Sequence, residues 1–284
     1  MSFGPLVSTE WLAANLDAPD VKIVDGSWRM PGQPPSVENY NAQHIPGAVF
    51  FDIDAIADRD THLPHMLPAP SQFAQAVGEL GISDKDRVVV YDEIGLFSAA
   101  RVWWTFRAMG HEEVAVLNGG LPRWLKEGRP VTAEKPVPIQ TTYTPRPNPA
   151  LVADADAVRA ALSGAGTVLD ARSAERFAGK APDPRPGVRP GHMPGAANMP
   201  FANLLDGGGL KSPQELSAIF TDAGITPETP VVTSCGSGVT AAVLSLALEV
   251  IGSRAHALYD GSWSEWGAET NDNALFPVVT DAED

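Results

Sequence analysis

The sequence His44-Ile-Pro-Gly-Ala48 returns as His192-Met-Pro-Gly-Ala196, and its surroundings return with it. Upstream of each copy, a β-branched stretch ends in an aspartate, at Asp25 and at Asp170. Downstream of each copy lies a segment with apolar residues at helical spacing. A match that extends over neighbouring blocks in the same order indicates a duplicated structural unit.

The blocks after the repeat also correspond. Residues 70–82 and 212–225 each begin with a Ser/Pro pair and end at glycine, which predicts two helices with a capping residue and a glycine stop. Buried-strand patterns follow at 87–92 and 230–235, and each runs through a small-residue turn into an apolar helix. This alternation predicts two α/β domains, each with a central, mainly parallel sheet flanked by helices.

The stretch between the two copies has a different composition. Six prolines lie between Pro130 and Pro149, with few apolar residues among them, which is typical of an extended connector. We therefore expect an N-terminal domain over residues 1–130, a linker over 131–150 and a C-terminal domain over 151–284.

Charge and cysteine content limit the classes of function. The 284 residues contain 35 acidic and 20 basic residues, a formal charge of −15, which argues against nucleic-acid and membrane-surface partners. The N-terminal residues do not have a secretory pattern, and the apolar stretches are too short to span a bilayer. A single cysteine cannot form an internal disulfide, and this suits a reducing, cytoplasmic location.

The two halves differ at the end of one strand. The first half has Asp92 there and the second has the lone cysteine, in Cys235-Gly-Ser-Gly-Val-Thr-Ala-Ala242. Gly236 and Gly238 allow successive backbone N–H groups to point inward and, together with Val239 and Thr240, to form an anion-cradling loop. The N-terminus of the following helix adds partial positive charge, so the loop should stabilise a thiolate or persulfide. A buried, inert cysteine would not need such a loop.

These motifs resemble the rhodanese superfamily. The resemblance rests on Asp170-Ala-Arg, on the His192 motif, on the Cys235 loop and on Tyr259-Asp-Gly-Ser-Trp-Ser-Glu-Trp-Gly267, and it covers nearly the whole chain. It implies tandem rhodanese-like domains, a catalytically silent first domain, and a sulfurtransferase that carries sulfur as a Cys235 persulfide. Within the superfamily, a loop that is neutral apart from its thiol resembles the branch that takes sulfur from 3-mercaptopyruvate and releases pyruvate.

The resemblance also implies roles for other side chains. Arg176 and Arg185 match the family's substrate-binding arginines, and planar guanidinium groups suit a donor carboxylate. The alternative is a pair of solvated charges in a loop with other basic residues. Ser237 is expected to donate a hydrogen bond to the persulfide or donor, and His44 is expected to exchange protons with it.

His44 has an equally simple structural interpretation, because a histidine before Pro-Gly can fix a turn by hydrogen bonds, as expected for His192. Relatives place an acidic residue in the loop before this histidine. Here residues 26–43 contain no aspartate and a single glutamate, Glu38. Either Glu38 orients His44, or the relay is incomplete. Asp25 and Asp170 are expected to hold local backbone.

Several alternatives stay open. Thiosulfate is the other candidate donor, although Gly236 and Ser237 offer no side-chain cation to a dianion. A phosphatase would need an arginine at position 241, which is alanine. A non-catalytic sulfur-relay or binding protein is the alternative from another class. We expect no metal and no cofactor, and an acceptor that is a thiol, such as thioredoxin or glutathione, or cyanide.

Overall fold

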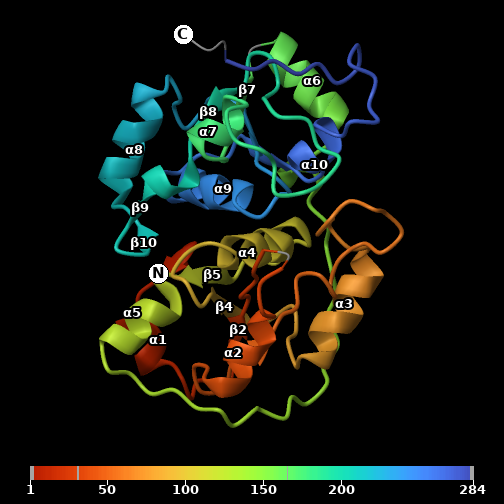
Figure 1. Cartoon of the computed structure of the whole chain (residues 1–284). Helices are drawn as coiled ribbons and strands as arrows, with labels where there is room; N and C mark the ends of the chain where they lie inside the picture. Colours follow the sequence, from red (N-terminus) through yellow and green to blue (C-terminus); the bar gives the residue numbers. More distant parts are fainter. Residues whose placement is uncertain (1–2, 31, 165, 282–284) are drawn as a thin grey trace. The chain divides into compact units, whose positions relative to one another are not determined.

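The computed structural model describes residues 3–30, 32–164 and 166–281, and the chain folds into two compact units (Figure 1). Unit 1 contains the residues up to Arg59, Leu67–Asn148 and Leu205–Lys211. Unit 2 contains Asp60–Met66, Pro149–Leu204 and the residues from Ser212 onward. Each half of the sequence therefore contributes a short segment to the unit built mainly by the other half.

Unit 1 is built around a five-stranded sheet in the order β1-β5-β4-β2-β3, and all neighbouring strands are parallel. The strands are β1 (Leu6–Val7), β2 (Val21–Asp25), β3 (Val49–Phe50), β4 (Arg87–Tyr91) and β5 (Val114–Leu117). The helices are α1 (Thr9–Ala14), α2 (Ser36–Ala42), α3 (Pro70–Glu79), α4 (Ala99–Ala108) and α5 (Gly120–Lys126).

Unit 2 repeats this plan, with parallel strands in the order β6-β12-β11-β7-β8. Its strands are β6 (Val152–Ala153), β7 (Thr167–Asp170), β8 (Ala197–Asn198), β11 (Val231–Ser234) and β12 (His256–Tyr259). Its helices are α6 (Ala155–Ser163), α7 (Ala174–Phe177), α8 (Pro213–Asp222), α9 (Ala241–Val250) and α10 (Ser262–Trp266), with 3-10 turns η1 (Pro149–Leu151) and η2 (Phe201–Leu204). The expected fold class is confirmed.

A small antiparallel hairpin, β9 (Leu205–Asp206) and β10 (Gly209–Leu210), comes from the second half of the sequence but belongs to unit 1. The side-chain oxygen of Asn118 accepts a hydrogen bond of 2.8 Å from the Leu210 N–H. The hairpin is therefore anchored at the end of β5.

The central elements are apolar because both faces of each sheet are covered. Val88, Val89 and Val90 of β4 are fully buried, as expected for a strand between two helical layers. Helix α9 is buried along most of its length, which matches its almost uninterrupted apolar sequence. Burial of this kind is the main favourable contribution to folding.

The two helices expected at 70–82 and 212–225 are both present, but they begin differently. Helix α8 follows Ser212, whose hydroxyl accepts from the Glu215 N–H while the Glu215 carboxylate accepts from the Ser212 N–H, a complete capping box. Helix α3 begins at Pro70 with Ala69 at the N-cap, so Ser71 lies inside the helix. The prediction of a capping side chain was wrong there, because the proline supplies the preorganised first turn instead.

The proline-rich segment is also different from the expected linker. Residues 131–148 lack helix and extended strand, but they belong to unit 1 rather than to a connector. Thr132 pairs with His44 through two backbone hydrogen bonds, and Tyr143 is 5% exposed against Phe73 and His111. The boundary therefore falls near residue 148, and the segment is bound along unit 1.

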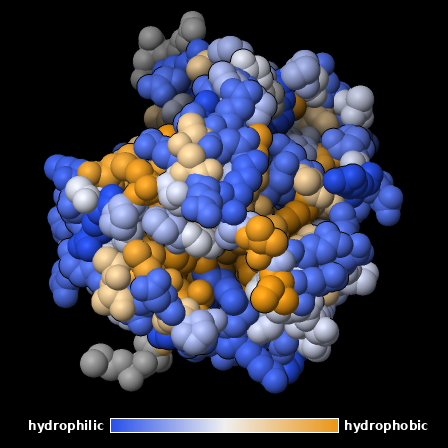
Figure 2. Space-filling model, turned by 90° about the horizontal axis from the view of Figure 1, so that it is seen from below, coloured by the Kyte–Doolittle hydropathy of each residue, from blue (hydrophilic) through white to orange (hydrophobic). Residues whose placement is uncertain are grey.

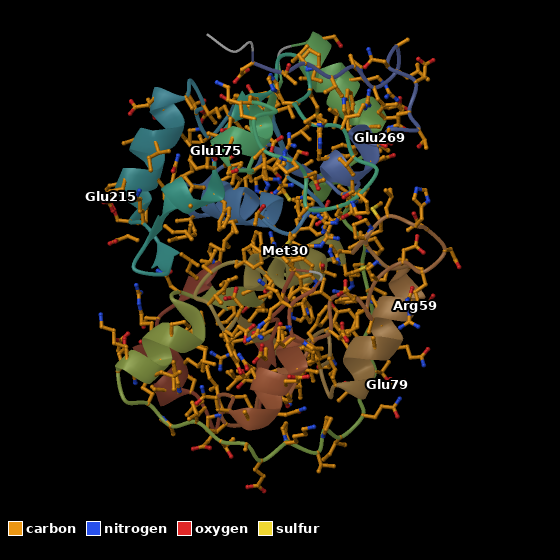
Figure 3. All side chains as sticks on the ribbon, in the orientation of Figure 1. Met30, Arg59, Glu79, Glu175, Glu215 and Glu269 are labelled. Carbon is orange, nitrogen blue, oxygen red and sulfur yellow. The ribbon has the colours of Figure 1, made fainter. Side chains whose placement is uncertain are left out.

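The surface agrees with the acidic composition. Glu79, Glu175, Glu215 and Glu269 are exposed on the segments that Figure 3 labels. The face in Figure 2 is largely hydrophilic, with apolar side chains in groups between the polar ones. In the part of the chain that the structure describes, every helix is too short or too polar to cross a bilayer.

Candidate active site

Cys235 is the first residue after β11, at the carboxyl end of a central parallel strand of unit 2. Its side chain is a free thiol, and the residue is 2% exposed. Gly238 adopts φ +80°, which turns the loop into helix α9 at a position that favours glycine. Val239 is buried, and Thr240 is the N-cap residue of α9. The expected strand, loop and helix are all present.

The first residues of helix α10 hold this loop by hydrogen bonds. The Trp263 N–H donates to the Cys235 carbonyl at 2.9 Å, and both the N–H and the hydroxyl of Ser264 donate to the Gly236 carbonyl. The Cys235 N–H donates to the Ser262 hydroxyl at 3.3 Å. The sequence showed only that this segment resembles the family and gave it no role. In the structure, the segment fixes the backbone on either side of the thiol.

The two predicted arginines reach the same loop. A β-carbon placed on Gly236 would lie 3.0 Å from Arg176 Nη2 and 3.4 Å from Arg185 Nη1. Arg185 Nη2 also donates to the Ser237 hydroxyl at 2.8 Å. Glycine at position 236 is therefore what allows both guanidinium groups to lie against the residue that follows the thiol.

Arg176 and Arg185 are held by an acid that the sequence analysis did not single out. Asp183 Oδ2 lies 2.5 Å from Arg176 Nη2, and Asp183 Oδ1 accepts from the Arg185 backbone N–H at 3.0 Å. The Asp183 side chain is only 4% exposed. The sequence shows Asp183 two positions before Arg185, and this spacing was the available signal. Only the fold of the loop brings Asp183 to Arg176.

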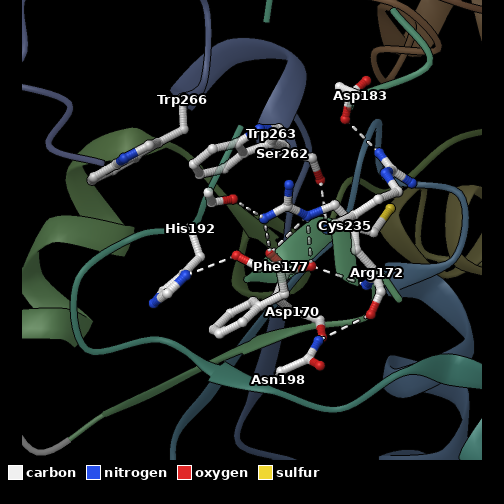
Figure 4. A network of polar contacts seen from close by, with 12 residues as sticks. Asp170, Arg172, Phe177, Asp183, His192, Asn198, Cys235, Ser262, Trp263 and Trp266 are labelled. Atoms are coloured by element: carbon white, nitrogen blue, oxygen red, sulfur yellow. Dashed lines mark hydrogen bonds and ion pairs between the residues drawn. The ribbon is translucent and has the colours of Figure 1, made fainter. Parts of the chain in front are cut away.

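A buried ion pair lies below the loop (Figure 4). The carboxylate of Asp170 accepts from the backbone N–H and the guanidinium of Arg172, with a shortest distance of 2.7 Å. Arg172 also donates to the Gly191 carbonyl and lies over the Trp263 ring at 4.2 Å. Asp170 thus holds local structure, as expected, and it does so through Arg172.

In unit 1, the position equivalent to Cys235 is occupied by the carboxyl group of Asp92. The carboxylate of Asp92 is fully buried and accepts four backbone hydrogen bonds of 2.7–3.1 Å. Desolvation raises the pKa of Asp92, and the four N–H groups oppose that effect. The donors are the N–H groups of Ile94, Gly95, Phe97 and Ala99. The N–H groups of this loop therefore point toward the side chain at the end of the strand.

The loops of the two units share the first turn but not the length. Gly95 and Gly238 occupy the same position relative to the strand end, and both have positive φ. Helix α4 begins at Ala99, seven positions after Asp92, whereas α9 begins at Ala241, six positions after Cys235. In unit 2 the thiol takes the place of the carboxylate in a loop that is one residue tighter.

His44 is fully buried, and both of its ring nitrogens face backbone carbonyl groups. Nδ1 lies 2.7 Å from the Tyr40 oxygen, Nε2 lies 3.1 Å from the Glu134 oxygen, and the ring stacks on Tyr40. Glu38 is exposed on α2 and is not the residue that orients the ring. These contacts fit the structural role considered for His44, and its role in proton transfer stays a prediction.

His192 has the corresponding geometry in unit 2. Its Nδ1 lies 2.8 Å from the Phe177 oxygen, and its ring stacks on Phe177 at 3.8 Å. Its backbone pairs with Val279, as the backbone of His44 pairs with Thr132. The repeated histidine therefore fixes a turn and attaches the segment that follows each unit's last helix. Among the described residues, no cluster of three metal-binding side chains is found.

The comparison with protein families gives a direct result. The model of the rhodanese-like domain matches residues 8–127 and again residues 154–269. The chain therefore belongs to the rhodanese family, in which it has two copies of the domain.

Full-length relatives narrow the class further. The chain is 43% identical to 3-mercaptopyruvate sulfurtransferase of Escherichia coli, over 95% of this chain and 98% of that protein. It is 44% identical to the mitochondrial thiosulfate/3-mercaptopyruvate sulfurtransferase 1 of Arabidopsis thaliana, over 93% of this chain and 76% of that one. The crystal structure of SseA from Escherichia coli superimposes with a TM-score of 0.83 at 40% identity, over 93% of this chain and all of that chain. The protein is a sulfurtransferase.

Proposed function

We propose that this sulfurtransferase takes sulfur from 3-mercaptopyruvate and passes it, through a persulfide on Cys235, to a thiol acceptor. The observation that carries the proposal is the approach of Arg176 and Arg185 to Gly236, the residue next to the thiol. Two guanidinium groups at this point suit a donor with a carboxylate and a keto group.

The chemistry follows from the nucleophile. The Cys235 thiolate attacks the donor sulfur, a sulfur–sulfur bond forms and the donor carbon–sulfur bond breaks. The electron pair of that bond leaves with carbon as the enolate of pyruvate, which takes up the proton of the donor thiol. We infer that backbone N–H groups of the Cys235 loop stabilise the persulfide anion that remains, as four N–H groups hold the Asp92 carboxyl group in unit 1.

Ser237 is proposed to orient the donor. Its hydroxyl oxygen accepts from Arg185, so its own proton is available to donate to the persulfide or to the enolate oxygen. The second half-reaction is attack of an acceptor thiolate, or of cyanide, on the outer sulfur, which restores the Cys235 thiolate. Thioredoxin, glutathione and cyanide all have the required nucleophile, and a lone cysteine is compatible with a cytoplasmic location.

Thiosulfate is the second candidate donor, since relatives are named for it as well. The donor is tested by comparing kcat/KM for 3-mercaptopyruvate and for thiosulfate at one cyanide concentration. We expect a clear preference for 3-mercaptopyruvate, and we expect Arg185→Ala to raise its KM by roughly tenfold or more, because a charge-assisted hydrogen bond is lost. A preference for thiosulfate, or an unchanged KM in the variant, would refute the donor assignment.

A further inference from the structure

Helix α7 and the loop that follows it bring three charged residues together, Arg176, Asp183 and Arg185. Asp183 accepts from the Arg176 guanidinium through one carboxylate oxygen and from the Arg185 backbone through the other. The Arg176 side chain is 24% exposed and that of Asp183 is 4% exposed. One nearly buried carboxylate thus connects the two arginines that reach Gly236.

This contact has an electrostatic consequence. Two guanidinium groups that lie within 3.0–3.4 Å of a single β-carbon position repel each other. The Asp183 carboxylate pairs with Arg176 and offsets one positive charge, so the three side chains together carry one net positive charge. Interactions between charges are strong at a site shielded from water, so each added or removed charge changes which anions bind.

We propose that Asp183 is a positioning and specificity-determining residue: it holds Arg176 against the loop and leaves the arginine pair with one net positive charge toward the donor. A donor with a single carboxylate then meets one complementary charge. A dianion such as thiosulfate leaves one negative charge uncompensated in a protein whose formal net charge is −15. Selection by an uncompensated charge is a general route to specificity. This inference rests on the proposed function, because it concerns the choice between its two candidate donors.

The test is Asp183→Asn, which keeps the size of the side chain and an oxygen for the Arg185 N–H while it removes the charge. Turnover of 3-mercaptopyruvate and of thiosulfate is measured with cyanide as acceptor. We expect the ratio of kcat/KM for thiosulfate to that for 3-mercaptopyruvate to rise on the order of tenfold. The matched control is Glu269→Gln, which changes the net charge equally at an exposed position and should leave the ratio unchanged.

A second variant keeps the test decisive if Asp183→Asn fails to fold. Arg176→Gln removes one positive charge from the same cluster, so the ratio should fall instead of rising, whatever the absolute rates. A ratio that stays constant in both variants, or equal losses with both donors, would overturn the proposal and leave Asp183 with a purely structural role.

A different result would refute the donor assignment without refuting the role of Asp183. If the wild-type protein itself prefers thiosulfate, the proposed donor is wrong. A ratio that still rises in Asp183→Asn and falls in Arg176→Gln would nevertheless support Asp183 as the residue that sets the charge preference.

Discussion

Position 235 and its counterpart, position 92, separate the two units chemically. Both residues follow a buried central strand and enter a loop with a glycine of positive φ. Asp92 satisfies the inward N–H groups of its own loop, so unit 1 has no nucleophile and no vacant anion site there. We expect the backbone N–H groups of the Cys235 loop to stabilise a sulfur anion in the corresponding place. The difference between Asp92 and Cys235 is therefore the basis of the prediction that unit 1 is catalytically silent and unit 2 is reactive.

At this scale we predict that Cys235→Ser abolishes turnover, because a serine hydroxyl is too weakly acidic to replace the thiolate and cannot hold a persulfide. Incubation of the wild-type protein with 3-mercaptopyruvate, followed by intact-mass measurement, should show the gain of one sulfur atom. The serine variant should show no gain. Sulfur bound to the variant would place the carrier on a different residue.

The extended segments that follow α5 in unit 1 and α10 in unit 2 are attached to their units by the same kinds of contact. Trp124 donates to the Pro130 carbonyl at 2.7 Å, and Trp266 donates to the Pro277 carbonyl at 2.9 Å. The backbones of His44 and His192 then pair with the same two extended segments. The proline-rich stretch is therefore the counterpart of the C-terminal segment of unit 2, and it completes unit 1.

Tyr143 tests this assignment. Its ring packs edge-on against Phe73 at 5.3 Å, and its hydroxyl lies 3.2 Å from His111 Nδ1. Tyr143→Ala should lower the free energy of unfolding by roughly 3–5 kcal/mol, the usual cost of truncating a buried aromatic ring. Val137→Ala, in the same segment but 92% exposed, is the control and should have little effect. Equal stabilities of the two variants in a denaturant titration would argue for a free linker.

Across the whole molecule, the two units differ in the partners of an equivalent buried aspartate, Asp25 in unit 1 and Asp170 in unit 2. Asp170 is paired with Arg172, whereas the residue two positions after Asp25 is Ser27. Burial raises the pKa of Asp25 to about 6, and hydrogen bonds from Ser27 and Tyr91 only partly offset that effect. Unit 1 therefore holds a carboxyl group that ionises at a cost, and unit 2 holds a compensated ion pair.

The pH dependence follows from the raised pKa. Between about pH 4 and pH 6 the folded unit 1 binds more protons at Asp25 than the unfolded chain does, so its stability should fall as the pH rises through this range. A shift of about two pKa units corresponds to roughly 3 kcal/mol. The melting temperature of Asp25→Asn should rise relative to that of the wild type as the pH increases from 4.5 to 7.5. A constant difference between the two proteins would contradict this prediction.

Much of this molecule could be predicted from the order of its residues. The duplication, the parallel α/β architecture and the position of Cys235 all follow from periodicity and from small residues at turns, which are local properties of the chain. The substrate-binding role of Arg176 and Arg185 came from the resemblance and stays a prediction; within unit 2 both guanidinium groups lie close to Gly236. The prediction of a capping side chain for α3 was wrong, and the contacts of the proline-rich segment and of His44 were not readable from the sequence, because each depends on the partner that folding supplies.

By itself, the sequence determined which half carries the thiol and what type of loop holds it, since both depend on residue identity over a short stretch. The tertiary structure decided which groups meet there. Asp183 contacts two arginines that are nine positions apart in the sequence. The Ser262 hydroxyl accepts a hydrogen bond from the Cys235 N–H, and both ring nitrogens of His44 face backbone carbonyl groups. Hydrogen bonds and charge compensation act through space, so only the folded chain determines these partners.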